Sequence, residues 1–350
     1  FSLQFPSPWS LRKLHPELRI PPTLAVWTRA IPIRFVVDKS VDFIIMSTDD
    51  DAQAAATNMC CASCGNTEGD EVKLKTCAAC KLVRYCSVKC QKEHRPQHKA
   101  RCKERVAELH DEILFQQPES SHLGDCPICL LPQSLYHDDA TMMTCCTKII
   151  CDGCKFANMV HEMEANLESK CPFCRKPESK SKAECIQNRM KRIEKKDPVA
   201  IREHGAWCLE EKDLGGAVTF LTQASNLADA EAHYQLSKLY RDGEGVEKDS
   251  KKEWRLLEKA AIGGHPAARH NLGAREGNKC RYERAKKHYI IAANLGQDDS
   301  IKALKQGYEI GFVSKEEFAD ALRAYQAAKD ETNSSQREAA KDYLAKREGW

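Results

Sequence analysis

The spacing of the cysteines constrains this fold more than any other feature of the sequence. Of the 19 cysteines in 350 residues, sixteen lie between Cys60 and Cys174, mostly in closely spaced pairs. Such a framework is either the disulfide scaffold of a small secreted domain or a set of metal ligands in a reducing compartment. Because the chain shows no convincing secretory signal, we interpret the pairs as zinc ligands.

The composition excludes two other classes of protein. Hydrophobic residues make up 42% of the chain, yet no stretch approaches the roughly 18 consecutive apolar residues that a membrane-spanning helix requires. The formal net charge is only +3, from 54 basic and 51 acidic residues, so the chain as a whole gives no strong signal for binding polyanions. We therefore expect a protein of the cytoplasm, the nucleus or both, with no membrane contact.

The first 58 residues carry no clear periodicity. The chain begins with Phe1, contains several prolines and scattered basic residues up to Ile45, and has its first methionine at Met46. We interpret Met46 as the initiator and the residues before it as a gene-model extension; a targeting peptide is the alternative. Residues 1–58 are expected to be disordered.

The first cysteine-rich segment, residues 59–105, contains four ligand pairs. They are Cys61-x2-Cys64, Cys77-x2-Cys80, Cys86-x3-Cys90 and His98-x3-Cys102. Eight ligands match two closed tetrahedral zinc sites, which leave no open position for catalysis. The segment has few large apolar residues, so metal binding must supply most of its folding free energy, on the order of 10 kcal/mol per site. Cys60 competes as the first ligand, but only Cys61 gives the two-residue gap.

This ligand order, together with Tyr85-Cys86-Ser87 and Cys90-Gln91, resembles the MYND zinc finger. In that family the pairs alternate between two metals. The resemblance therefore implies one zinc on Cys61, Cys64, Cys86 and Cys90 and another on Cys77, Cys80, His98 and Cys102. Gln91 matches a residue of the family's peptide groove, whereas Arg95 stands where a groove tryptophan is usual.

A linker, residues 106–124, leads to a second cysteine-rich segment, residues 125–176. Its pairs are Cys126-x2-Cys129, Cys145-Cys146, Cys151-x2-Cys154 and Cys171-x2-Cys174. This order of pairs resembles an all-cysteine RING finger. The resemblance implies a third zinc on Cys126, Cys129, Cys151 and Cys154 and a fourth on Cys145, Cys146, Cys171 and Cys174. Adjacent ligands on one metal are awkward, so the alternative is that His137 or His161 replaces one of them.

A RING finger of the ubiquitin system carries no nucleophile and acts by orienting its partners. The resemblance implies that Ile128 and Pro172 form the docking groove for a ubiquitin-conjugating enzyme. Arg175 resembles the cationic linchpin that contacts both that enzyme and ubiquitin, a role that suits the planar fork of arginine. Asn158 departs from the apolar residue that many active RING fingers carry at this position.

The chain repeats from residue 197 to residue 330, after a basic linker, residues 177–196, that we expect to be helical. Similar units begin at Asp197, Asp229, His265 and Gln297, with spacings of 32, 36 and 32 residues. Small residues recur three positions later, at Ala200, Ala232, Ala268 and Ser300. A period in the thirties predicts about four helix pairs stacked in an α-solenoid.

The motif Leu239-Tyr240-Arg241-Asp242-Gly243-Glu244-Gly245 resembles the Sel1-like repeat, a relative of the tetratricopeptide repeat. That resemblance implies a surface for a client protein, and a structural spacer is the alternative. Residues 331–350 are expected to form a charged helix or tail.

The sequence thus predicts a multidomain fold in which two small zinc-stabilised α+β modules precede an all-α solenoid. This order resembles multidomain zinc-finger proteins of diatoms and related protists. Our leading hypothesis is a RING-type E3 ubiquitin ligase with four Zn²⁺, which docks a ubiquitin-charged conjugating enzyme and recruits a client through the solenoid and the MYND finger. A noncatalytic adaptor is the rival hypothesis. A nucleic-acid-associated regulator is weaker, and nucleic acid is not an expected partner.

Overall fold

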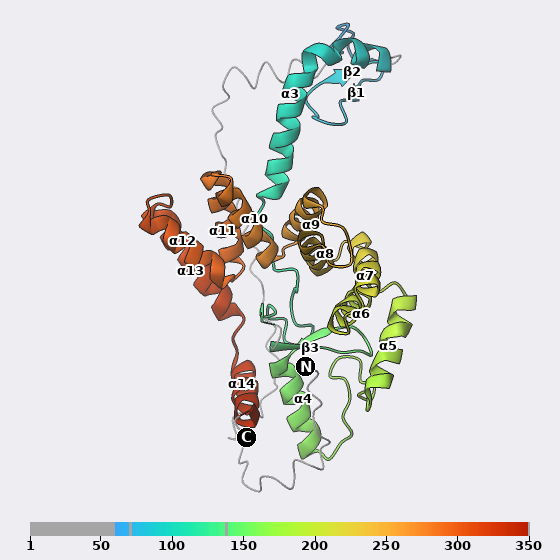
Figure 1. The fold of residues 1–350 in the computed structure, drawn as a ribbon, viewed down its shortest axis with the longest axis vertical. Helices are drawn as coiled ribbons and strands as arrows, with labels where there is room; N and C mark the ends of the chain where they lie inside the picture. Colours follow the sequence, from blue (N-terminus) through green and yellow to red (C-terminus); the bar gives the residue numbers. More distant parts are fainter. Residues whose placement is uncertain (1–59, 70–71, 137–138, 349–350) are drawn as a thin grey trace. The chain divides into compact units, whose positions relative to one another are not determined.

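The computed structural model describes residues 60–69, 72–136 and 139–348 and divides the chain into two compact units, residues 1–107 and 108–350. In Figure 1 the colours follow the chain from the first cysteine-rich module through the helical repeats to the last helix. The expected fold class, small cysteine-rich modules followed by a helical solenoid, is confirmed. The expectations for residues 1–58, including initiation at Met46, lie outside the described residues.

The first unit contains a minimal hairpin and the start of a long helix. Strand β1 (Lys75–Thr76) pairs antiparallel with β2 (Arg84–Tyr85), and α3 (Val88–Leu114) follows and continues into the second unit. Its buried core consists of Cys61, Leu74, Cys77, Cys80, Tyr85 and Cys90. Four of these six residues are expected ligands, so metal binding and core formation are the same event in this unit.

The second unit begins with another small α+β module. Strand β3 (Ala140–Met142) pairs antiparallel with β4 (Ile149–Cys151), and α4 (Asp152–Glu164) follows directly. Two isolated bridges, Asp125 with Pro132 and Lys170 with Pro177, close the loops that carry the first and last cysteine pairs. Met143 and Ile150 are the buried residues of its core that are not cysteines.

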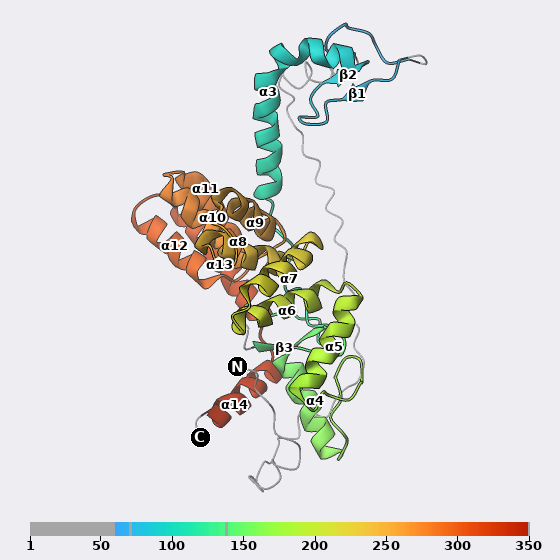
Figure 2. The ribbon, with the colours of Figure 1, turned by 45° about the vertical axis from the view of Figure 1, so that its right-hand side comes forward.

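The rest of the second unit is helical. Its helices are α5 (Lys182–Glu194), α6 (Pro198–Glu210), α7 (Leu214–Asn226), α8 (Ala230–Asp242), α9 (Ser250–Ile262), α10 (Pro266–Asn278), α11 (Tyr282–Asn294), α12 (Asp298–Glu309), α13 (Lys315–Glu331) and α14 (Ser335–Glu348). Figure 2 shows α6 to α13 grouped together, with α14 apart from them. The closest packing is within the consecutive pairs α6–α7, α8–α9 and α10–α11. Among the helices described, none combines the length and the apolar character that crossing a bilayer requires.

The repeat pattern in the sequence marks where helices begin. Its anchor residues are the N-caps of α6, α8, α10 and α12: Asp197, Asp229, His265 and Gln297. The small residues three positions later are fully buried where helices meet: Ala200, Ala232, Ala268 and Ser300. Glycine is required where the helices α8 and α9 are joined, because Gly245 has a φ of 69° and a Cβ there would lie 2.9 Å from the Cβ of Leu214.

The first repeat replaces a core leucine with histidine. Leu236, Leu272 and Leu304 are buried at equivalent positions of the later repeats, and His204 occupies this position in the first. His204 is also buried, and its ring packs edge-on against Phe220 with centroids 4.4 Å apart. An aromatic cluster therefore replaces the aliphatic contact at this end of the solenoid.

The segment that we predicted to be a linker is packed against the repeats. Leu114 is fully buried in a cluster with residues of α9 and α10. The buried guanidinium of Arg269 donates hydrogen bonds to the carbonyls of Leu114 and Ala261. Phe115 packs against the ring of His288 on α11, with centroids 4.7 Å apart. This segment therefore joins the second zinc module to the repeats as part of one packed unit.

Candidate metal centres

Four clusters of candidate metal ligands lie in the two modules. In each cluster the ligand atoms all lie within 4.8 Å of one another. The clusters are Cys61, Cys64, Cys86 and Cys90; Cys77, Cys80, His98 and Cys102; Cys126, Cys129, Cys151 and Cys154; and Cys145, Cys146, Cys171 and Cys174. We call them centres 1 to 4 in this order. In both modules the first pair joins the third and the second joins the fourth, so the two centres of each module are cross-braced.

The sulfur–sulfur distances fit zinc and exclude disulfides. The Sγ atoms of Cys64 and Cys86 lie 3.5 Å apart in centre 1, and those of Cys129 and Cys151 lie 3.8 Å apart in centre 3. A disulfide requires about 2.05 Å. Tetrahedral zinc with bonds of about 2.3 Å to sulfur places its ligands about 3.8 Å apart. The donor sets, seven pairs of cysteines and one histidine–cysteine pair, are those of structural zinc sites.

In the first module, backbone amides favour the thiolate form of Cys61 and Cys77, whereas the pKa values of Cys64, Cys86 and Cys102 are raised. Burial raises the pKa of Cys61, but hydrogen bonds from the backbone of Cys64, Cys86 and Ser63 lower the pKa to about 6. Cys77 is similar: burial raises its pKa, and the backbone of Cys80 with the His98 side chain lowers it to about 6. Thiolates are the form of cysteine that binds zinc, so these turns favour the required ionisation state.

Centre 2 includes the only histidine among the expected ligands. Nε2 of His98 lies 3.3 Å from Sγ of Cys80, and the His98 side chain is buried. The ring of Tyr85 packs edge-on against His98, and its hydroxyl lies 3.1 Å from Nδ1 of His94. Tyr85 therefore has a structural role, holding the first turns of α3 over the metal ligands.

Centre 4 accommodates two adjacent cysteines because they face different partners. Sγ of Cys145 lies 3.3 Å from Sγ of Cys174, and Sγ of Cys146 lies 3.8 Å from Sγ of Cys171. The chain turns directly after the pair, where Thr147 has a φ of 59°. His161, the alternative ligand, is exposed on α4 and is not part of this cluster. His137, the other alternative, lies outside the described residues.

The residues expected to dock a conjugating enzyme differ in their exposure. Ile128 is half-buried against the core of the second module, and Pro172 is buried. Arg175 is exposed and donates a hydrogen bond to Oδ1 of Asn158 at 3.1 Å. Asn158 in turn donates to the carbonyl of Lys170 at 3.3 Å. The structure thus joins Arg175 to the polar residue that departs from the RING pattern.

In the first module, the residues expected to contact a peptide lie on the surface. Gln91 and Arg95 are both exposed near the start of α3. Cys60, which competed as a ligand, forms a backbone bridge with Thr67 and is not part of centre 1.

A fifth cluster, which the sequence interpretation missed, joins the former linker to the repeats. Nε2 of His122 and Nε2 of His265 lie 3.3 and 2.8 Å from the same carboxylate oxygen of Glu231. Burial raises the pKa of Glu231, but the hydrogen bonds from the two histidines outweigh it and hold the pKa well below its usual range. One feature of the sequence points to this cluster: His265 occupies the position at which the other repeats begin with Asp197, Asp229 or Gln297.

This fifth cluster is a hydrogen-bonded contact between segments and not a metal site. The backbone N–H of Ala268 donates to Nδ1 of His265 at 3.2 Å, so Nε2 of His265 carries the ring hydrogen and has no lone pair for a metal. The rings of His122 and His265 are also stacked, with centroids 4.1 Å apart and planes inclined by 13°. Both rings therefore donate to Glu231.

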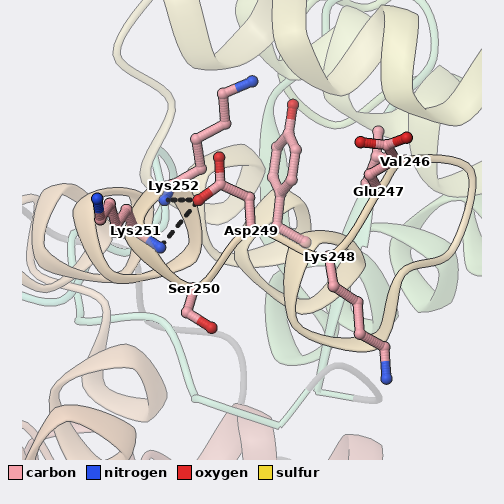
Figure 3. A pocket seen from close by; sticks show the side chains of 8 residues that line it. Val246, Glu247, Lys248, Asp249, Ser250, Lys251 and Lys252 are labelled. Atoms are coloured by element: carbon pink, nitrogen blue, oxygen red, sulfur yellow. Dashed lines mark hydrogen bonds between the residues drawn. The ribbon is translucent and has the colours of Figure 1, made fainter.

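An open pocket of about 610 Å³ lies at the turn between α8 and α9, lined by Tyr240 and residues 246–252 (Figure 3). Its lysines and the start of α9 suggest an anion site. However, Oδ1 of Asp249 already accepts hydrogen bonds from the backbone N–H groups of Lys251 and Lys252, at 2.9 and 3.0 Å. The helix start is therefore capped by the chain's own carboxylate, and we assign no ligand to this pocket.

Comparisons with known proteins agree with the expectation for the first module. The model of the MYND finger family matches residues 61–102, which confirms the MYND expectation for this segment. The SET domain and MYND-type zinc finger protein 6 of Schizosaccharomyces pombe is 41% identical over 90 residues. That match covers 25% of this chain and 17% of the yeast protein, so the chain spans about a sixth of this relative.

Two solved structures are similar to part of the chain. A Sel1 repeat protein from Oxalobacter formigenes is 26% identical, with a TM-score of 0.32, over 35% of this chain and 97% of that one. The protective antigen c5321 of uropathogenic Escherichia coli, which displays an SLR fold, is 19% identical with a TM-score of 0.34, over 47% of this chain and 37% of that one.

Proposed function

We propose that this zinc-binding protein is a RING-type E3 ubiquitin ligase whose helical repeats recruit the client. The observation that carries the proposal is in the second module: two cross-braced cysteine centres, with exposed Arg175 directly after the last ligand. The helical repeats and the MYND finger are features of interaction proteins, which suits a ligase that must hold a client near a conjugating enzyme.

The proposed mechanism is orientation, with no covalent step on this chain. Zinc, when bound, fixes the two loops that carry Ile128 and Pro172. Ile128 then supplies apolar contact to the conjugating enzyme. Arg175 exchanges its hydrogen bond with Asn158 for hydrogen bonds to ubiquitin and the enzyme, which restricts the thioester to a reactive arrangement. Arg175 is exposed, so breaking its hydrogen bond with Asn158 costs little.

The repeats offer a client an apolar surface that the rest of the described chain leaves exposed. Tyr282, Ile310 and Phe312 are exposed near the ends of α11 and α12. The rings of Tyr282 and Phe312 are stacked, with centroids 4.4 Å apart. In contrast, the face formed by α9 and α10 is covered by Leu114 of the chain itself. We therefore propose that the client binds near Phe312. Separately, we propose that Gln91 belongs to a peptide-binding surface of the first module.

The test measures discharge of ubiquitin from a panel of charged conjugating enzymes to free lysine, with zinc-loaded protein. We expect acceleration by the unmodified chain, loss of acceleration in Ile128→Ala, and a weaker effect in Arg175→Ala. Lys176→Ala is the matched control, because Lys176 is an exposed cation beside Arg175. Acceleration that survives in Ile128→Ala contradicts the proposed docking groove.

A noncatalytic adaptor is the second candidate function, and the burial of Pro172 favours it. A docking proline must present surface to the enzyme, whereas Pro172 is buried and the neighbouring Asn158 is polar. If no enzyme of a broad panel is accelerated while all four centres retain zinc, the adaptor replaces the ligase as the proposed function.

A further inference from the structure

The last helix packs closely against the second zinc module, although the two segments lie far apart in the sequence. Helix α14 lies beside α4 (Figures 1 and 2), and the rings of Phe156 and Tyr343 have centroids 4.9 Å apart. The approach depends on glycine: a Cβ at Gly153 would lie 2.8 Å from the backbone nitrogen of Arg337 and 2.9 Å from its Cγ. Gly153 directly precedes Cys154, a ligand of centre 3, so α14 lies against the metal site itself.

Arg337 of α14 extends into the loop that carries the first cysteine pair. Arg337 is only 7% exposed. One terminal nitrogen donates to the carbonyls of Pro132 and Thr332, at 2.7 and 2.6 Å. The other donates to the carbonyl of Leu131 at 3.3 Å and to Sγ of Cys129 at 3.6 Å. The guanidinium therefore binds the backbone of this loop and one zinc ligand at once.

The charge of Arg337 is balanced by the cysteines of centre 3. Among the described residues no carboxylate forms an ion pair with it, and its three carbonyl partners are neutral. Four thiolates on one Zn²⁺ carry a net charge of −2, and a buried cation and a buried anion each require such a partner.

We propose that α14 belongs to the second zinc module and that Arg337 is the positioning residue of centre 3. Its N–H···S hydrogen bond and its positive charge hold the Cys129 thiolate in the ligand position. They also withdraw electron density from that sulfur, which lowers its reactivity toward electrophiles. Groups in this position typically change metal affinity 10- to 100-fold when mutated. Centre 4 provides an internal comparison, because its neighbouring arginine, Arg192, donates to the carbonyl of Cys146 and not to its sulfur.

The test uses the full zinc-loaded chain and two readouts that do not involve ubiquitin. The first is the rate of zinc transfer to a chromogenic chelator. The second is the order in which individual cysteines are alkylated, mapped by mass spectrometry. In Arg337→Met we expect one zinc ion per chain to be released at least about tenfold faster, with Cys129 alkylated before Cys145. Arg337→Lys keeps the positive charge but loses the planar guanidinium and its several donors, so we expect zinc release at an intermediate rate.

Two further variants separate positioning from general destabilisation. Lys346→Met alters an exposed lysine of the same helix and should leave both readouts unchanged. Gly153→Ala keeps Arg337 but forces α14 away, and should reproduce the early alkylation of Cys129. The inference is overturned if Arg337→Met releases zinc at the unmodified rate, or if centres 3 and 4 become equally labile in that variant.

Discussion

The hydroxyl of Thr147, directly after the adjacent cysteines of centre 4, donates a hydrogen bond of 2.6 Å to Oδ2 of Asp197. The other oxygen of the same carboxylate accepts hydrogen bonds from the backbone N–H groups of Val199 and Ala200, at 3.1 and 3.3 Å. One side chain therefore caps the first helix of the repeats and holds a zinc loop. Arg192 supports the same contact, with 3.2 Å between its terminal nitrogen and Oδ2.

Two substitutions at Asp197 separate these roles. Asp197→Asn keeps the capping oxygen but loses the charged acceptor for Thr147, which we expect to cost about 1.5–2 kcal/mol of unfolding free energy. Asp197→Ala also loses the cap, at a further cost of about 1 kcal/mol. Urea unfolding followed by circular dichroism measures both values. Equal costs for the two variants would contradict the division of roles.

Loss of one ligand should unfold the first module and spare the repeats. Cys86→Ser breaks centre 1, and the core of this module is built mainly from ligands. We expect zinc content to fall by at least one ion per chain, with the helicity of residues 108–350 retained. Cys60→Ser is the control, because Cys60 lies outside the cluster, and it should keep full zinc content. Elemental analysis and circular dichroism check both outcomes.

Leu114→Ala should strongly destabilise the second unit, because it leaves a cavity between α9 and α10. We expect a loss of about 2–5 kcal/mol in unfolding free energy. The adjacent Ile113 is the matched control: it is 56% exposed, and Ile113→Ala should change stability by no more than about 0.5 kcal/mol. Similar losses in thermal or urea unfolding for both variants would show that the segment is not packed as described.

Acid should destabilise the repeats through two buried histidines. Burial lowers the pKa of His233 to about 4, helped by the charge of Lys259. Burial lowers the pKa of His288 to about 3, helped by Arg269 and Arg284. Both folded pKa values lie below the value of about 6.5 for an unfolded histidine, so the unfolded chain takes up protons first as the pH falls. Stability is then lost progressively from about pH 6.5 toward the folded pKa values.

Between pH 7.5 and pH 6.0, each of these histidines lowers the free energy of unfolding by about 0.8 kcal/mol. Urea unfolding at these two pH values measures it, with zinc content followed in parallel so that metal loss is not mistaken for histidine titration. His288→Gln should remove about 0.8 kcal/mol of the pH dependence. Burial also lowers the pKa values of His122, His204 and His270, which contribute to the remainder. A variant with the full pH dependence would exclude His288 as one of the groups responsible.

Much of the helical architecture was predictable because its determinants are local and periodic. An N-cap side chain accepts hydrogen bonds from backbone N–H groups, and a residue at a close contact between helices must have a small side chain. Asp229 and Ala232 meet these requirements, so they mark the start of their repeat in the sequence. The assignment of ligands to the four centres was predictable from the sequence for a related reason. Zinc demands four donors at short range, so the spacing of the cysteine pairs leaves few arrangements.

The contacts between distant segments were not predictable from these patterns. Arg337 lies on a helix with an ordinary charged sequence, and nothing near it in the chain indicates a zinc ligand as its partner. His122 was likewise assigned to a linker, because its partner Glu231 lies more than 100 residues away. Helix α3 continues through Pro96 to Leu114, although proline removes a backbone donor within it. In these cases tertiary packing outweighs the local signal.

The contact between α14 and centre 3 also sets an order of events during synthesis. Cys126 to Cys174 are translated long before Ser335 to Glu348, at roughly 5–20 residues per second. On a ribosome, the cysteines of centre 3 therefore meet zinc while Arg337 is still missing, and the nascent site is held by its thiolates alone. The finished metal site is thus a late product of translation, and for roughly ten seconds or more its sulfurs lack the arginine that holds Cys129 in the completed protein.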